Sequence, residues 1–283
     1  RLRKTDINYI NKYWGACEDK SAPTLEKIHN KYYLRFSFTE TVILSDTPIA
    51  EQIICAVDLG INTDAVCSIM KADGTILARK FIDFTSDKDR MIHTMNRTRR
   101  KQSKYGPKSA RGLWAYVKRL NEDRAKKISA AIVEFASQHS VDAIVMEHLD
   151  FKGCKKRGSK VQRLSMWNHG IIREKVEQKA HLLGIRIATI CAWKTSALAF
   201  DGSGSVARDD NNHALAAFTT GKQYNCDLSA SYNIGARYFI REFLKSLPAT
   251  EESRVKAKVP DVGRRTSCTL STLRALVKEL SAA

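Results

Sequence analysis

The chain has 283 residues, of which 48 are Lys or Arg and 30 are Asp or Glu, so its formal net charge is +18 at pH 7. A charge of this size favours a polyanionic partner by Coulomb attraction, with nucleic acid well ahead of an anionic membrane surface. No apolar run approaches the roughly 18 to 20 residues that a membrane-spanning helix needs, so we expect a soluble protein without membrane spans.

Seven cysteines are spread singly along the chain, with no CxxC pair: Cys17, Cys55, Cys67, Cys154, Cys191, Cys226 and Cys268. This odd set argues against a disulfide scaffold and against a zinc ribbon. The start, RLRKTDINYI, is basic but leads into no apolar stretch, so no signal peptide is expected. A reducing compartment is therefore the default expectation.

Residues 1 to 50 are interpreted as part of a small β-domain. The first residue is Arg1 and not Met, which suggests that the N-terminus was trimmed or separated from a longer polypeptide. In the segment YYLRFSFTETVIL, residues 32 to 44, alternating aromatic and polar residues predict one long strand. Because one strand cannot form a domain, its partners are expected elsewhere in this segment or before Arg1.

From residue 53 onward, three strands are predicted in meander order. IICAVDLG is almost continuously apolar, DAVCSIM follows it, and ILARKFIDF comes after the turn ADGT. The first strand contains Asp58 near its end. A meander with an acid at the end of its first strand is the opening of an RNase H-like fold.

Residues 86 to 112 form a basic insertion in this pattern. The segment HTMNRTRRKQSKYGPKSAR contains no acid and predicts a solvated basic arm or helix. We expect its basic residues to grip a phosphate backbone: Arg97, Arg99, Arg100, Lys101, Lys104, Lys108 and Arg111. Trp114, Tyr105 and Trp193 could stack on bases. Packing within the protein is the alternative, and it is favoured for Trp193.

Helix and strand then alternate, as in a parallel β-α-β unit. Residues 113 to 139 have apolar positions three and four apart and predict an amphipathic helix. The strand DAIVMEHLD and the basic loop GCKKRGSK follow. A helix over 163 to 183 then leads through Gly184 into the strand RIATICAW. Residues 51 to 194 therefore form the predicted core.

The last third of the chain divides into three parts. Residues 195 to 225 are loop-rich and have little periodicity. Residues 226 to 247, beginning CDLSASYNIGARYF, predict a helix. The tail from 248 to 283 is expected to end in a short helix, TLSTLRALVKEL. The predicted fold class is therefore α/β, with an RNase H-like mixed sheet, helical insertions and a preceding β-rich fragment.

Three acids lie at or near the ends of predicted core elements: Asp58, Glu147 and Asp227. Each has an ordinary alternative role, as a turn cap, a lysine partner or a helix N-cap respectively. A carboxylate that follows several apolar residues is costly to bury unless a cation compensates its charge. Two-metal hydrolysis of phosphodiesters requires carboxylates from different elements to converge, and oxygen ligands suit magnesium or manganese. Together, in a cationic chain, the three acids predict a metal-dependent nuclease.

The motifs around these acids resemble RNA-guided nucleases of the TnpB kind and the type V CRISPR effectors. AVDLGINTDAV is similar to the first RuvC motif of that family, IVMEHLDFKG to the second and DLSASYNIG to the third. The resemblance makes Asp58, Glu147 and Asp227 the catalytic, metal-binding acids. It also places RRKQSK in a bridge-helix region, and Arg208 where related nucleases carry an arginine near the scissile phosphate. A solvated surface role is the alternative for Arg208.

The resemblance implies partners and a larger architecture. It implies a guide RNA, a target DNA, a prokaryotic cytoplasm, and either a separate N-terminal recognition lobe or a second copy of the protein. YYLRFSFTETVIL is similar to the last strand of a wedge domain. WNHGIIREKVEQKAHLLGIRIATICAWKTS is similar to the stretch that leads into a target nucleic-acid-binding insert, here residues 195 to 225.

The sequence departs from the family pattern at two places. Of the four cysteines that the family's insert uses for zinc, only Cys226 is present, so zinc is not expected. Ser229 stands where the family commonly has Asn, which concerns the details of the third motif and not its acid.

Two rival functions remain open. Actin-like ATPases and sugar kinases also open with a strand ending in DxG, and DGSGSV at 201 to 206 looks superficially like a phosphate loop. Against that reading, a kinase has no use for the basic run, and no later Gly-Gly adenosine loop is found. The second rival is an RNA-guided DNA-binding protein whose nuclease centre does not cut, although loss of an acid, its usual sign, is not seen here.

Overall fold

The computed structural model describes residues 2–17, 19–28, 30–37, 39–149, 167–209, 212, 214–264 and 266–282. The chain divides into two compact units, Arg1–Ile43 and Leu44–Ala283. The basic loop GCKKRGSK and the first residues of the helix expected from 163 lie outside the described residues. None of the helices within the described ranges is both long enough and apolar enough to cross a membrane.

The first unit contains one helix, a short π-helical turn and a two-stranded antiparallel ribbon. Their bounds are α1 (Lys4–Ile10), the π-helical turn Asn11–Gly15, β1 (Thr24–Ile28) and β2 (Lys31–Arg35). The prediction of one long strand over residues 32 to 44 was therefore wrong for the described residues beyond Arg35. All five residues of β2 are exposed, so the ribbon has no buried face that would favour a longer ladder.

The second unit is built on a five-stranded mixed sheet in the order β5-β4-β3-β6-β7. The strands β3, β4 and β5 form the predicted antiparallel meander, and β6 and β7 run parallel to β3. This arrangement confirms the predicted RNase H-like class. The bounds are β3 (Ile53–Asp58), β4 (Ala65–Lys71), β5 (Ile76–Ile82), β6 (Ala143–His148) and β7 (Arg186–Cys191).

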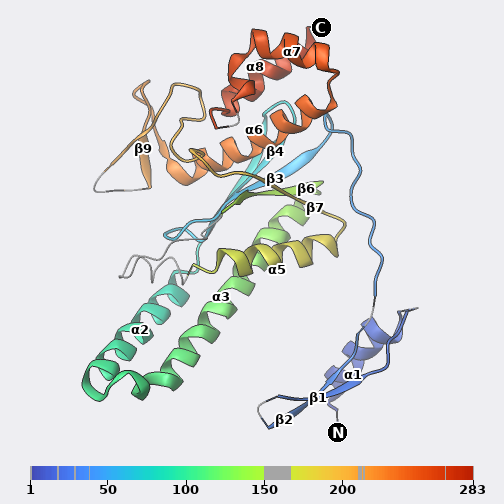
Figure 1. Ribbon diagram of the computed structural model, residues 1–283, viewed down its shortest axis with the longest axis vertical. Coiled ribbons are helices and arrows are strands. Elements are labelled where there is room, and N and C mark those ends of the chain that lie inside the picture. The colour runs from blue at the N-terminus through green and yellow to red at the C-terminus, as the bar shows by residue number, and fades with distance from the viewer. Residues whose placement is uncertain are drawn as a thin grey trace. The chain divides into compact units, whose positions relative to one another are not determined.

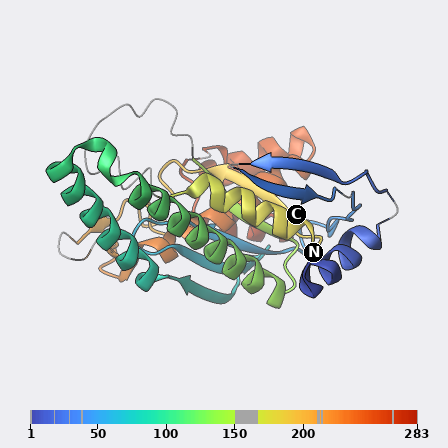
Figure 2. The same ribbon diagram turned by 90° about the horizontal axis from the view of Figure 1, so that it is seen from below.

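Helices cover both faces of this sheet (Figure 1). On one face, the core includes Ile54, Ala56 and Val145 and is closed by α6 and α8. On the other face, Cys55, Val57 and Ile144 pack against α3 and α5, which lie side by side below the sheet (Figure 2). The bounds are α3 (Arg111–Gln138), α5 (His169–His181), α6 (Cys226–Ser246), α7 (Ala249–Lys258) and α8 (Leu270–Ser281).

The basic insertion forms a helical hairpin that extends from the sheet (Figure 1). It consists of α2 (Thr85–Tyr105), a 3-10 turn (Pro107–Ala110) and α3, and we call it the basic hairpin. Met91, Met95 and Val117 join its two helices, and the half-buried Trp114 packs against them. Trp114 thus packs within the protein, which is the alternative to stacking on a base.

The segment predicted to be loop-rich contains a small antiparallel sheet. Its strands are β8 (Ala207–Arg208), β9 (Leu215–Ala217) and β10 (Gln223–Asn225), in the order β10-β9-β8. Phe200 and Phe218 form part of its core, with ring centroids 5.5 Å apart. Strands of two or three residues are too short to give a clear alternating pattern in the sequence.

Candidate active site

Two of the three acids lie next to each other at the carboxyl ends of parallel strands. In the pairing of β3 with β6, Val57 lies opposite Met146, so Asp58 and Glu147 are the next residues along their strands. Alternate side chains of a strand point to the same face. Ala56 and Val145 belong to the core under α6, and therefore Asp58 and Glu147 also lie on the α6 face.

The third acid, Asp227, lies in the first turn of α6. The helix begins there because the side chain of Asn225 accepts a hydrogen bond of 2.9 Å from the Leu228 N–H. Further along, α6 lies directly against the sheet at Gly235, where an added Cβ would come within 2.9 Å of the Met70 side chain. This close contact sets the height of α6 above the strand ends, and so the height of Asp227.

The electrostatics show that the three carboxylates share one region. Burial, followed by the negative charges of Glu147 and Asp227, raises the pKa of Asp58 well above its usual value. Burial also raises the pKa of Glu147, against the opposing effects of Thr195 and Arg237. Three acids that were separated by up to 169 positions thus lie close enough for their charges to interact.

Asp227 is influenced by two neighbours besides its own burial. Burial raises its pKa, while the positive charge of Arg208 and a hydrogen bond from the Thr63 side chain oppose that rise. Arg208 also lowers the pKa of Asp58 through its charge. It is exposed, and its guanidinium hydrogen-bonds the Ser196 hydroxyl at 3.0 Å. The structure therefore brings Arg208 to the acids, while its predicted role near a phosphate stays a prediction.

The loop between β3 and β4 depends on Gly60 for its shape. An added Cβ at Gly60 would lie 2.5 Å from the Thr63 carbonyl oxygen, which is a backbone atom that cannot easily move aside. Glycine therefore allows the loop to fold tightly enough for Thr63 to reach Asp227.

The donor set suits a hard divalent cation in its chemistry. Asp58, Glu147 and Asp227 supply carboxylate oxygens, and oxygen ligands are those that magnesium and manganese prefer. The three side chains are not close enough together to share one ion. Within the described ranges, no group of three or more His, Cys, Asp or Glu side chains is placed so that it could hold one metal ion. Mutual repulsion of partly buried carboxylates is a physical reason for such spacing.

Glu147 is held from behind by a network that the sequence did not reveal. The buried Thr195 hydroxyl hydrogen-bonds Glu147 Oε1 and lies 3.0 Å from the Ala192 carbonyl oxygen. The amide of the buried Asn233 donates to the carbonyls of Thr195 (3.0 Å) and Leu198 (2.9 Å). Two signals for this network were present in the sequence: the polar residues Thr195 and Ser196 shortly after RIATICAW, and Asn233 within an otherwise apolar helix.

Arg237 lies one helical turn after Asn233 and completes this network. Its guanidinium donates to the carbonyls of Cys191 (2.9 Å), Trp193 (2.8 Å), Thr266 (3.0 Å) and Cys268 (3.2 Å). Four carbonyl partners satisfy a buried cation without an acid in direct contact. Trp193 itself is 65% exposed, so the expectation that it packs inside the protein was wrong: Arg237 fixes its backbone, while its ring faces solvent.

Two departures from the family pattern can be located. Ser229 is 2% exposed, and its hydroxyl has no hydrogen-bond partner among the residues that the structure describes. Cys226 is buried in the core of the small sheet beside Ala199 and Ala216.

A further buried carboxylate, Asp64, joins the basic hairpin to the core. It is fully buried and forms ion pairs with Arg124 of α3 and, at 3.1 Å, with Lys88 of α2. It also accepts a 2.8 Å hydrogen bond from the Phe84 N–H. Burial would raise its pKa, but these donors outweigh burial and lower the pKa.

The seven basic residues predicted to grip phosphate are all exposed on the basic hairpin: Arg97, Arg99, Arg100, Lys101, Lys104, Lys108 and Arg111. No acid occurs between Asp89 and Glu122, so this part of the hairpin is purely cationic. Within the described residues, six of them form no ion pair: Arg97, Arg100, Lys101, Lys104, Lys108 and Arg111. The arrangement suits a polyanion.

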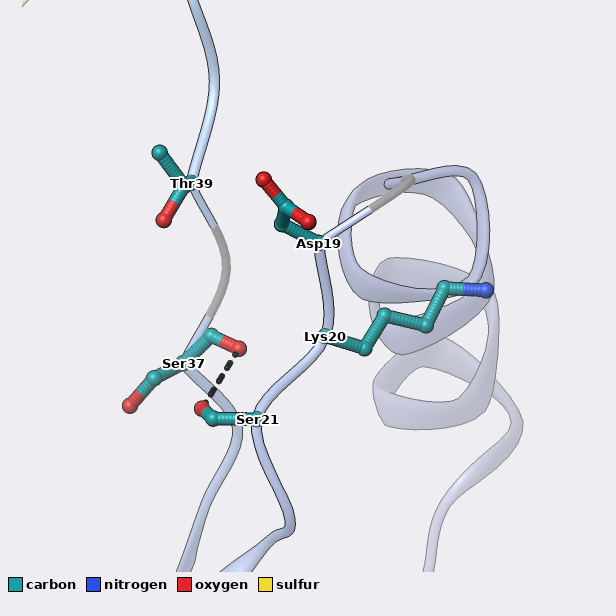
Figure 3. Close-up of a pocket in the computed structure, with 5 residues that line it drawn as sticks. All are labelled: Asp19, Lys20, Ser21, Ser37 and Thr39. Atoms are coloured by element: carbon teal, nitrogen blue, oxygen red, sulfur yellow. Dashed lines mark hydrogen bonds between the residues drawn. The ribbon is translucent and has the colours of Figure 1, made fainter.

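The first unit has a small surface pocket of about 380 Å³ (Figure 3). Its lining residues are Asp19, Lys20, Ser21, Ser37 and Thr39, and all five are exposed. The Ser21 hydroxyl donates to the Ser37 carbonyl at 3.3 Å across it. A pocket with no buried polar group offers little for specific ligand recognition.

No protein-family model matches the sequence, and no curated protein matches it. Solved structures do. One is a Cas12f1–sgRNA–target DNA complex, at 19% identity over 67% of this chain and 51% of that chain, with a TM-score of 0.48. A CRISPR-Cas12f ternary complex matches at 16% identity over 83% and 49%, with a TM-score of 0.47. Thermus thermophilus RuvC with a Holliday junction matches at 10% identity over 68% and 96%, with a TM-score of 0.37.

These neighbours include CRISPR effector complexes and RuvC, the groups that the three acid motifs resemble. The chain spans about half the length of the two Cas12f chains.

Proposed function

We propose that this chain is the nuclease part of an RNA-guided DNA endonuclease, which hydrolyses phosphodiester bonds at one site with magnesium or manganese. The observation that carries the proposal is the approach of Asp58, Glu147 and Asp227 from two strand ends and a helix start. The net charge of +18 and the acid-free part of the basic hairpin between Asp89 and Glu122 support a nucleic-acid partner.

The proposed chemistry assigns a role to each group near the acids. Asp58, Glu147 and Asp227 would hold the divalent cations, which activate water and neutralise the leaving oxygen in such reactions. Arg208, whose charge reaches Asp58 and Asp227, would bind the phosphate that is cut. The basic hairpin would bind the backbone of the guide–target duplex.

The intact protein is tested with the RNA that copurifies with it and with a DNA duplex that matches the guide segment of that RNA. Cutting is expected only when magnesium or manganese is present. Asp58→Ala should abolish cutting while leaving DNA binding largely intact, because the hairpin is unchanged. Asp89→Ala removes an exposed carboxylate from α2 and is the matched control. Equal cutting by Asp58→Ala and wild type would refute the assignment.

One observation favours a second candidate, a guided DNA-binding protein that does not cut. The charges of the three acids interact. Within the described residues, however, no three His, Cys, Asp or Glu side chains are spaced to hold one metal ion. A displacement of about 1 Å can cost a large factor in rate. Tight, guide-dependent DNA binding by wild type without cutting, at any concentration of magnesium or manganese, would establish this candidate.

A further inference from the structure

The edge strand β5 places an aromatic residue in line with the acids. Across the sheet, Asp58 pairs with Val66, and Val66 pairs with Phe81. Residues that pair in this way point to the same face. Val66 belongs to the core under α6, so Phe81 lies on the face that carries Asp58, about 10 Å away at the usual strand spacing.

This aromatic residue is not covered by the helix that covers its neighbours. Phe81 is 50% exposed, whereas Val66 in the adjacent strand is 1% exposed. The next residue, Ile82, points to the opposite face and is 4% exposed. The α6 layer therefore ends before β5, and the ring of Phe81 is left open to solvent beside the acids.

The same face of β5 carries a cation. Arg79, two residues before Phe81, pairs with Ser68 and is exposed. Its charge lowers the pKa of Tyr232 against the larger effect of burial, so the guanidinium lies toward α6. In the described part of the chain Arg79 has no ion pair or hydrogen bond from its side chain, so its charge is available to a ligand.

A second cation lies on the other side of a tyrosine pair. The Tyr224 and Tyr232 hydroxyls are 3.1 Å apart, and the Lys222 ammonium lies 5.1 Å from the Tyr224 ring centroid. Asp83, the acid directly after the end of β5, forms an ion pair with Lys88 of α2. Arg79 is therefore the cation that neighbours Phe81 on the same face of β5.

We propose that Arg79 and Phe81, which we call the β5 strip, bind a single nucleic-acid strand on its way to the acid site. Phe81 stacks on a base and Arg79 binds a phosphate. This combination of ring and cation is how proteins hold single strands without reading sequence. The distance from Asp58 corresponds to about three nucleotides at the stacked rise of 3.4 Å. The inference rests on the proposed function and names the partner of the same site.

A protein segment is the other occupant that an exposed ring could have. Arg79 decides between the two, because its guanidinium would lose hydration against an apolar segment, whereas a phosphate backbone would pair with it.

The test measures binding of a fluorescently labelled single-stranded oligonucleotide to the full chain, by anisotropy, without a guide RNA or a divalent cation. Phe81→Ala should weaken binding roughly 5- to 150-fold, the range found for loss of one base–aromatic stack. Phe81→Tyr keeps the ring and should remain near wild type. Leu77→Ala removes an exposed apolar side chain from the same strand and is the control.

Arg79→Gln should lower the slope of log affinity against log salt by about 0.7, the value for one phosphate contact on a single strand. Unchanged affinity in Phe81→Ala, or equal losses in Phe81→Ala and Phe81→Tyr, would overturn the β5 strip. Cutting by wild type is scored separately. A wild type that cuts while Phe81→Ala binds normally refutes only the strip, and a wild type that binds through the strip but never cuts refutes only the nuclease.

Discussion

Replacing Thr195 by Val tests whether the hydroxyl behind Glu147 prepares the acid to hold a cation. Val has nearly the same shape as Thr, so the change removes a hydrogen bond without opening a cavity. Thr195 is 3% exposed, and its hydroxyl donates a hydrogen bond to Glu147 Oε1. A hydrogen bond to a charged group contributes roughly 1.5 to 3 kcal/mol.

That free energy corresponds to a factor of roughly 10 to 100 in an equilibrium constant. The same range is typical when a residue that supports a metal ligand is replaced. Thr195→Val should therefore raise the manganese concentration for half-maximal cutting about 10- to 100-fold. Thr195→Ser keeps the hydroxyl and should restore most of the affinity.

Two measurements separate this role from a loss of folding. Isothermal titration of manganese into the full chain reports binding without any cutting, and thermal unfolding of the metal-free protein reports stability. We expect Val and Ser variants with similar stability but different manganese affinity. Identical manganese affinity in wild type, Thr195→Val and Thr195→Ser would show that the Thr195 hydroxyl does not prepare Glu147.

Three further predictions concern the surroundings of the acids. Asp64→Asn should lower the free energy of unfolding by about 3 to 5 kcal/mol, because it leaves the buried Arg124 without its anion. Urea denaturation measures this loss, and Asp89→Asn, a change at an exposed acid, is the control. Gly60→Ala should reduce cutting far more than stability, because it displaces Thr63 from Asp227, and equal cutting would contradict this account. The raised pKa of Asp58 means that, above pH about 4, this carboxyl holds more of its proton in the folded, metal-free protein than in the unfolded chain. The contribution of Asp58 to stability should therefore fall as pH rises above about 4. Thermal unfolding should show this fall in wild type relative to Asp58→Asn, and manganese should cancel it.

The sheet and the acids could be predicted because each depends on a local pattern. In IICAVD the first five positions are apolar, since both faces of β3 are buried, and the last residue, Asp58, ends the apolar run with a charge. Parallel pairing of β3 and β6 then brings two such breaks together. The prediction needed only the order of the strands, which the alternation of helix and strand supplied.

The supporting network could not be predicted in the same way. Thr195 meets Glu147 across 48 positions, and Asn233 meets Thr195 across 38. The residues around Thr195 and Asn233 in the sequence do not indicate which distant residue each one contacts. The extended strand over residues 32 to 44 failed for the opposite reason: its alternation is clear, but it has no buried face to support it. A sequence pattern can predict a strand, but the strand forms over its full length only where other elements pack against it.

The helix α6 is the element on which the proposed site depends most. Its first turn carries Asp227, Gly235 sets its distance from the sheet, and Asn233 and Arg237 hold the segment that contains Thr195. Arg237 and Asn233 also bind the backbone at 266 to 270, with Asn233 accepting from the Leu270 N–H at 3.3 Å. The segment interpreted from sequence as a tail is therefore part of the support of the acids, because its carbonyls satisfy the cation that fixes the end of β7. Any change that loosens α8 from α6 should reach Glu147 through Asn233 and Thr195, without touching an acid directly.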